Sequence, residues 1–300
     1  MNNVLAVVVT YNRIDMLKQC ISNLRNQTFD QFDVLIVNNA STDGTYEYLC
    51  ENTDSNLTAL HLNQNLGGAG GFNAGLRYGV ENGYEYCWIM DDDTLPQQDS
   101  LQCLIEADNV LNKSYGFLSS AALWTDGREC KMNRQKIKKN FYEDVHLLGE
   151  GIIRVEQATF VSMFIPVSTI IKVGLPITDF FIWGDDIEYS RRITVRYSLN
   201  SYLVGKSKVI HAMKDNNGSS IALDESARIA RYNYAFRNEN YLYRQEGLKG
   251  IAYYFAKCFL NIIRIIKFAK DSKFRRIAII LKNMIFGLFF NPIVEYVSKK

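Results

Sequence analysis

Strand-like and helix-like segments alternate along the first 125 residues of the chain. Mostly apolar runs, which are typical of buried strands, occur at 5–9, 34–37, 57–62 and 85–90. Apolar residues at helical spacing follow the first run, namely Met16, Leu17, Cys20, Ile21 and Leu24. Alternating strands and helices favour right-handed crossovers, so the pattern predicts an α/β fold with a mostly parallel, Rossmann-like sheet flanked by helices.

Turn and capping residues predict where further helices begin. Helices are expected near 45–50 and at 73–80, and Pro96 suits the first turn of another helix. Residues 126–155 are polar and basic without a strong period, which predicts a mobile loop or an excursion over an active site. Later segments predict helices beginning near Asp186 and over 225–244, and strands at 158–166, 202–204 and 208–211.

Three adjacent aspartates, Asp91, Asp92 and Asp93, follow the strand-like run that ends at Met90. Their charges repel one another, and their burial is costly unless a cation neutralises them. Hard divalent cations prefer oxygen ligands and bridge carboxylates to phosphates. Polar loops also follow the first two strands, at 10–13 and 38–43, so three loops are expected to meet at one crevice of the sheet. An acidic turn that merely caps a helix is the alternative.

Other polar segments add candidate chemistry. Residues 65–75 carry five glycines and are expected to form a loop that leads into a helix, whose first amides favour a diphosphate. Asp185, Asp186 and Glu188 follow the aromatic run at 181–183 and open a helix, where one carboxylate could act as a general base. Helix capping, with Glu188 paired to a following arginine, is the alternative for this cluster. His211 ends a strand-like segment and could be structural or a ligand.

Charge and cysteine content narrow the setting of the protein. The net charge of +2 conceals 11 basic and 2 acidic residues from Lys249 to Lys300, against 23 basic and 30 acidic residues elsewhere. Six cysteines without a C-x-x-C pair favour a reducing compartment, and the first residues do not resemble a signal peptide. We therefore expect a cytoplasmic protein with an anionic partner for its basic end and no nucleic-acid partner.

In their order and spacing these motifs resemble the large GT-A family of inverting nucleotide-sugar glycosyltransferases that includes chitin, cellulose and hyaluronan synthases. The resemblance covers about residues 4–245 and is strongest to the galactofuranosyltransferase and rhamnosyltransferase branch, whose members build bacterial surface polysaccharides such as O-antigen and capsule. It implies a GT-A domain at 1–245 and a separate region at 246–300. It also implies transfer of galactofuranose from UDP-galactofuranose, or else of rhamnose from dTDP-rhamnose, to a hydroxyl of a growing, lipid-linked glycan.

The resemblance also implies roles for individual residues. Asp91 and Asp93 match a D-x-D motif that holds Mn²⁺ or Mg²⁺, and His211 matches a histidine that completes the metal site. Asp186 matches the catalytic base, and Trp183, Asp185 and Glu188 would bind the acceptor. The nucleotide sugar would contact Thr10, Tyr11, Arg13, Asn39, Asn65, Gly68, Gly70, Asp91 and Asp92. The second loop begins with Asn38 where the branch usually has aspartate, so the choice between UDP and dTDP stays open, with UDP favoured.

The basic C-terminal region has an amphipathic pattern. Cationic and apolar residues lie on different sides of the helix expected from about residue 251, and the apolar runs are too short or too charged for a membrane span. This pattern predicts peripheral binding to the anionic inner face of the cell membrane. Docking on the body or on a second copy in a homo-oligomer is the alternative. Two other functional classes also remain, a sugar nucleotidyltransferase and a noncatalytic partner subunit.

Overall fold

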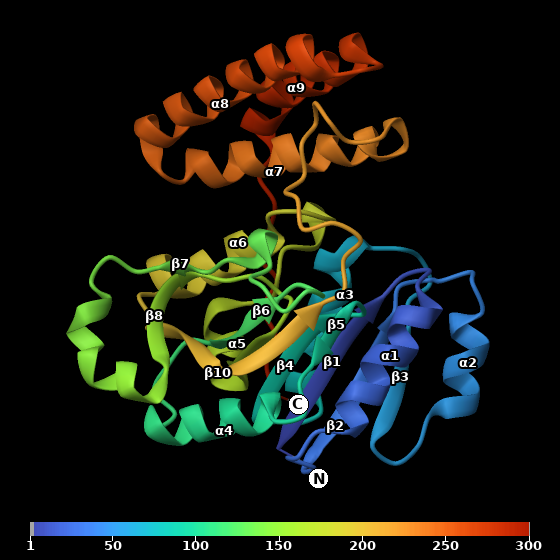
Figure 1. The fold of residues 1–300 in the computed structure, drawn as a ribbon, viewed down its shortest axis with the longest axis vertical. Coiled ribbons are helices and arrows are strands. Elements are labelled where there is room, and N and C mark those ends of the chain that lie inside the picture. Colours follow the sequence, from blue (N-terminus) through green and yellow to red (C-terminus); the bar gives the residue numbers. More distant parts are fainter. Residues whose placement is uncertain (1–2, 300) are drawn as a thin grey trace.

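Parallel strands form the centre of the sheet in the computed structural model, which describes residues 3–299. Every residue of β1 (Val4–Thr10) is buried, because parallel neighbours flank it and helices cover both faces of the sheet. The neighbours are β2 (Phe32–Asn38) and β4 (Tyr86–Asp91), and β3 (Leu57–His61) continues the sheet beyond β2. The predicted strands in the first 90 residues are therefore confirmed (Figure 1).

The second half of the sheet is mixed. β6 (Leu118–Leu123) and β10 (Ser201–His211) pair in parallel, whereas β5 (Thr94–Pro96), β8 (Ile152–Gln157) and β9 (Met163–Pro166) pair antiparallel with their neighbours. Within the described residues the strand order is β3-β2-β1-β4-β9-β6-β10-β8-β7, where β7 is Lys136–Ile137, and β5 pairs with β10. The α/β fold is confirmed, with a sheet that is mixed beyond β4.

Helices cover both faces of this sheet. α1 (Ile14–Arg25), α2 (Thr45–Asn52) and α4 (Ser100–Val110) pack their apolar side chains on one face. α3 (Gly67–Glu81) and α5 (Val167–Val173) pack on the other face. The crossovers bring the carboxyl ends of β1, β2 and β4 to one edge of the sheet, where the polar loops lie (Figure 1).

Several expectations about local structure are wrong. Pro96 ends the short strand β5, and the next helix begins only at Ser100. Residues 126–155 are not an irregular loop: they contain β7 (Lys136–Ile137), the start of β8 and two 3₁₀ segments, and they extend the sheet. The strand expected at 158–166 begins only at Met163. The two strands expected at 202–211 are one strand with an irregularity in its pairing to β6.

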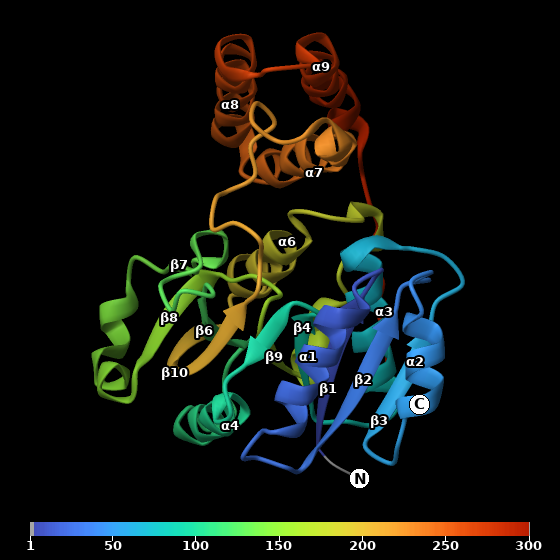
Figure 2. The ribbon, with the colours of Figure 1, turned by 45° about the vertical axis from the view of Figure 1, so that its right-hand side comes forward.

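Three long helices form a separate layer next to the sheet domain. They are α7 (Tyr232–Arg244), α8 (Gly247–Phe268) and α9 (Lys273–Phe289), and a shared apolar cluster joins them. A 3₁₀ turn at 226–231 precedes α7, where one continuous helix was expected. Figure 2 shows α8 and α9 side by side on the far side of α7 from the sheet. None of the helices in residues 3–299 has the length and hydropathy that a membrane span requires.

The chain after α9 returns to the sheet domain. The Leu175 amide donates to the Glu295 carbonyl over 2.8 Å, and the Glu295 carboxylate pairs with Arg77 over 2.6 Å. Val297 is buried in the apolar cluster around α3 and α5. We call residues 290–299 the C-terminal strap, because they tie the helical layer to the sheet domain (Figure 2). The division at residue 245 stays a prediction.

Candidate active site

The aspartate triplet lies where β4 ends beside β1. The hydroxyl of Thr10, the last residue of β1, donates to Asp92 Oδ2 over 2.7 Å. Asp92 and Asp93 are both buried. The loop after β1 also meets the loop after β2, since the Asn12 amide donates to Ser41 Oγ over 3.0 Å. The structure thus brings the three polar loops together at one edge of the sheet.

Strand pairing brings His211 to this edge. β5 follows the triplet directly and pairs with β10 so that Thr94 lies opposite His211. The Ala212 amide donates to the Asp93 carbonyl over 2.8 Å, and His211 Nε2 lies 3.1 Å from Asp93 Oδ1. These side chains are adjacent because of a long-range strand pair that no local sequence pattern reveals.

The other nitrogen of His211 contacts a residue that the sequence analysis missed. His211 Nδ1 donates to Asn133 Oδ1 over 2.8 Å, and Asn133 Nδ2 donates to Thr159 Oγ1 over 3.0 Å. Asn133 is buried and belongs to the segment that was expected to be a mobile loop or an excursion over the active site. Its contact holds the imidazole with Nε2 towards Asp93, the arrangement that supporting residues give to metal-ligating histidines.

Two cationic groups balance the buried carboxylates. Arg13 Nη1 lies 3.2 Å from Asp92 Oδ1 and 2.5 Å from Asp93 Oδ2. Burial and the charge of Asp93 raise the pKa of Asp91 to about 7. Burial opposes the charged form of His211, but its hydrogen bonds to Asp93 and Cys130 and the carboxylate charges raise its pKa to about 10. Both pKa shifts indicate that the carboxylates of the aspartate triplet favour a positively charged group beside them.

The donor set fits a divalent cation. Asp91, Asp93 and His211 each offer one ligand atom, and these atoms all lie within 4.8 Å of one another. Two carboxylates and one imidazole suit metals such as Mn²⁺, and Mg²⁺ accepts the carboxylates. A cation bound here would take over part of the charge balance that Arg13 provides at Asp93.

The residues expected to bind the nucleotide surround the same edge. Tyr11 is 44% exposed and follows Thr10. Asn39, which is buried, accepts from the Leu66 amide over 2.8 Å and donates to the Gly67 carbonyl over 2.8 Å. Asn65 Oδ1 accepts from the Gly67 amide over 2.8 Å. Asn39 and Asn65 thus fix the entry to α3, and their contact with a nucleotide stays a prediction.

The glycine-rich segment is helical rather than a loop. α3 begins at Gly67, and a Cβ on Gly71 would lie 2.4 Å from the Val9 side chain of β1. A Cβ on Gly70 would lie 2.4 Å from Leu66 Cβ, so Gly70 is needed for packing, and its contact with a donor stays a prediction. Gly68 has open space at its Cβ position, and its contact with a donor also stays a prediction.

The second acidic cluster lies in the first turn of a short helix. α6 (Asp185–Arg191) begins after Gly184, which has a φ of 84°. Burial, the charge of Asp186 and the charge of Asp91 raise the pKa of Asp185 well above its usual range. Burial raises the pKa of Asp186 to about 6, and its Oδ1 accepts from the Ile187 amide over 2.7 Å. The second cluster therefore lies within electrostatic range of Asp91.

The other two residues expected to bind the acceptor, Glu188 and Trp183, contact different neighbours. Both carboxylate oxygens of Glu188 accept hydrogen bonds from the buried Arg192, which in turn donates to the carbonyls of Val173 and Leu175. This contact is the ion pair that the sequence left as the alternative for Glu188, and a contact of Glu188 with the acceptor stays a prediction. Trp183 is half-buried, and its ring centroid lies 5.0 Å from that of Tyr232 on α7.

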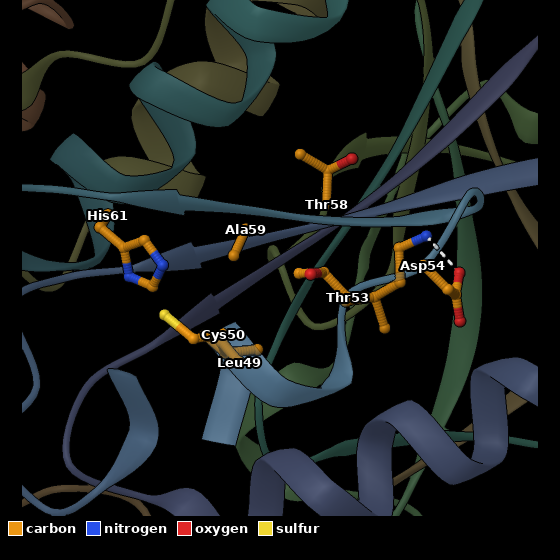
Figure 3. A pocket seen from close by; sticks show the side chains of 8 residues that line it. Leu49, Cys50, Thr53, Asp54, Thr58, Ala59 and His61 are labelled. Carbon is orange, nitrogen blue, oxygen red and sulfur yellow. Dashed lines mark hydrogen bonds between the residues drawn. The ribbon is translucent and has the colours of Figure 1, made fainter. Parts of the chain in front are cut away.

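A surface pocket lies away from the acidic clusters. It opens between α2 and the edge strand β3 and is lined by Leu49, Cys50, Thr53, Asp54, Leu57, Thr58, Ala59 and His61 (Figure 3). Asp54 pairs with Arg25 over 2.9 Å, and burial lowers the pKa of His61. Because the pocket contains no member of either acidic cluster, we do not assign it a role in catalysis.

Comparison with known proteins relates the chain to glycosyltransferases. Residues 5–122 match the model of Glycosyl transferase family 2. Galactofuranosyltransferase GlfT1 of Mycolicibacterium smegmatis is 25% identical over 263 residues, which cover 82% of this chain and 84% of that protein. Undecaprenyl-phosphate mannosyltransferase of Micrococcus luteus is 36% identical over 106 residues, covering 35% of this chain and 43% of that protein. The alignment to GlfT1 of Mycobacterium tuberculosis spans 64% of that relative's length.

Solved structures share the fold. GalNAc-T7 with UDP, GalNAc and Mn²⁺ superposes with a TM-score of 0.61 at 12% identity, covering 79% of this chain and 48% of that chain. Mannosyltransferase PcManGT from Pyrobaculum calidifontis, in complex with GDP-Man and Mn²⁺, gives 0.56 at 17% identity over 88% of this chain and 72% of that chain. These likenesses confirm the GT-A fold.

Proposed function

We propose that this chain, which carries a glycosyl transferase family 2 domain in residues 5–122, is a metal-dependent, inverting glycosyltransferase that uses a nucleotide-sugar donor. The observation that carries the proposal is the group Asp91, Asp93 and His211, whose ligand atoms lie within 4.8 Å of one another, with a second acidic cluster at the start of α6 within electrostatic range. The charge of Asp91, in the first cluster, acts on Asp185 in the second. Two separate groups of carboxylates suit two tasks: the first can help to stabilise a leaving diphosphate, and the second can deprotonate an attacking hydroxyl.

Asp91, Asp93 and His211 would hold Mn²⁺ or Mg²⁺ at the first cluster. When bound, the metal supplies positive charge that stabilises the departing nucleoside diphosphate. Arg13, whose side chain is half exposed beside Asp92 and Asp93, would move its guanidinium towards the donor phosphates. The remaining donor contacts would come from Thr10, Tyr11, Asn39, Asn65, Gly68 and Asp92.

Asp186 would accept the proton of the acceptor hydroxyl as its oxygen attacks the anomeric carbon and the sugar–phosphate bond breaks. Its carboxylate lies at the start of α6 and is half-buried, which keeps it reachable for a sugar. Trp183 and Asp185 would orient that sugar. Attack from the face opposite the diphosphate inverts the anomeric centre.

We propose galactofuranose from UDP-galactofuranose as the transferred sugar. The similarity to mycobacterial galactofuranosyltransferases, at 25% identity, supports this choice over rhamnose from dTDP-rhamnose. The acceptor would be a lipid-linked bacterial surface glycan, as in the synthesis of O-antigen or capsule. One relative is named for undecaprenyl phosphate, which supports a lipid-linked acceptor. We place the enzyme on the cytoplasmic face of the cell membrane, held there by the helical layer.

A donor screen tests the proposal. The purified protein is incubated with Mn²⁺ and each of a panel of nucleotide sugars, and release of the nucleoside diphosphate is measured. We expect UDP-galactofuranose to be hydrolysed fastest and a chelator to abolish the activity. With an acceptor glycan, the Asp186→Asn variant should bind donor normally but transfer on the order of 10²–10⁴-fold more slowly.

Three outcomes contradict parts of the proposal. Chelator-resistant turnover excludes the metal role of Asp91, Asp93 and His211. Normal transfer by Asp186→Asn excludes that residue as the base. A product whose anomeric configuration matches the donor, determined by NMR, excludes inversion.

A further inference from the structure

The turn that precedes α6 has an unusual backbone. Phe181 has φ 62° and ψ −62°, and the Ile182 amide donates to the Phe180 carbonyl over 2.7 Å. These values define a γ-turn of the rare, strained kind. Trp183 also has a positive φ, 66°, which is unfavourable for a bulky residue. Strained turns of this type persist only where surrounding groups hold them.

Asn238 of α7 holds this turn from one side. Its Nδ2 atom donates to the carbonyls of Phe180, Ile182 and Trp183 over 2.9, 3.2 and 2.8 Å. The side chain has no exposed surface, and its Oδ1 accepts from Arg237 Nε over 3.0 Å. A side-chain amide combines donors for the turn with an acceptor for the arginine, whereas a carboxylate lacks the donors.

The glycine-rich start of α3 also holds the turn. The Ala69 amide donates to the Phe181 carbonyl over 3.2 Å. Gly67 lies so close that a Cβ there would be 2.0 Å from the same carbonyl oxygen. The turn is thus fixed between α3, which the proposed donor residues adjoin, and α7, which belongs to the helical layer.

We propose that Asn238 is a positioning residue that holds the turn at 180–184 and thereby sets the location of Asp185 and Asp186 at the start of α6. This inference rests on the proposed role of Asp186 as the base. It gives the helical layer a function inside the active site, because α7 carries the residue that fixes the turn.

A matched pair of asparagines on α7 tests the proposal. Asn240 is buried like Asn238, but its Nδ2 donates to the Met284 carbonyl on α9 over 3.1 Å and does not contact the turn. The variants are Asn238→Ala, the near-isosteric Asn238→Asp in case the cavity of the first prevents folding, and Asn240→Ala. Hydrogen exchange of the peptide at 180–187 and the steady-state constants for transfer are measured for each, with melting temperature as a check on folding.

We expect both Asn238 variants to exchange faster at 180–187 and to lower kcat by on the order of 10²-fold, with the KM for donor unchanged. Asn240→Ala should leave both quantities at wild-type values. Wild-type exchange at 180–187, wild-type kcat, or an equal effect of Asn240→Ala overturns the proposal. Wild-type transfer by Asp186→Asn would refute the role of Asp186 as the base. The exchange measurement does not depend on Asp186, so it still tests whether Asn238 holds the turn.

Discussion

Asp185 and Asp186 are adjacent, but their surroundings favour Asp186 as the base. Asp185 is 8% exposed, and its pKa is raised well above the usual range by burial and by neighbouring charge. Its surroundings therefore disfavour the charged form that a base needs. Asp186 is more exposed, and burial raises its pKa only to about 6. A base is most effective when its pKa lies near the working pH, so Asp186 suits the role.

This difference predicts the pH dependence of transfer. Asp186 must be ionised to accept a proton, so kcat should fall as the pH falls through about 6 and should level off above about 7. The profile is measured at saturating Mn²⁺, which keeps protons from competing for Asp91. The residual activity of Asp186→Asn serves as the control and should lack this inflection. A wild-type profile that stays flat between pH 5 and 7 would contradict the assignment.

At the scale of elements, glycines let α3 approach the sheet. A Cβ on Gly75 would lie 2.3 Å from Val7 Cγ1, and one on Gly79 would lie 2.4 Å from Cys87 Sγ. Together with Gly71, these positions place one face of α3 directly on β1 and β4. This close contact explains a run of glycines that the sequence pattern alone assigned to a phosphate-binding loop.

Two glycine substitutions separate packing from ligand contact. Gly71→Ala should lower the unfolding free energy by about 1–3 kcal/mol, because its Cβ would meet Val9 at 2.4 Å in a close-packed core. Gly68→Ala should preserve the melting temperature, because its Cβ position is open, and should raise the KM for donor if Gly68 lies against the nucleotide sugar. Scanning calorimetry and donor titration measure the two effects. Equal melting temperatures for the two variants would contradict the packing role.

The sequence predicts elements well where the signal is local. The apolar runs of β1, β2 and β4 and the aspartates that follow β4 could be located from the sequence because each is a contiguous pattern. The pairing of β5 with β10 could not, because Thr94 and His211 are far apart in the chain. Asn133 and Asn238 were missed because their polar contacts are with distant residues. A buried asparagine on the apolar face of a helix is the signal that could have revealed Asn238.

At the scale of the whole molecule, one side of the helical layer contacts the sheet domain and the other side carries exposed hydrophobic side chains. α7 contacts the sheet domain through Asn238, and the C-terminal strap returns to that domain at Glu295 and Val297. The outer helices α8 and α9 carry most of the exposed large hydrophobic side chains of the described residues, accompanied by exposed lysines and arginines. Deleting residues 251–300 would also remove the buried Val297, so point substitutions are the better test of membrane binding.

Two exposed phenylalanines of α9 provide that test. Phe274 and Phe289 are 91% and 76% exposed, and insertion of each into lipid contributes about 1.5 kcal/mol or more. Replacing both with serine should weaken binding to phosphatidylglycerol vesicles by on the order of 10²-fold in sedimentation assays, with little change in stability. Tyr142→Ser with Val145→Ser is the matched control, because these side chains are 68% and 55% exposed on the sheet domain. Unchanged binding of the Phe274 and Phe289 variant to vesicles would contradict the membrane role of this face. A dimer that these substitutions dissociate would instead assign the face to a second copy of the chain.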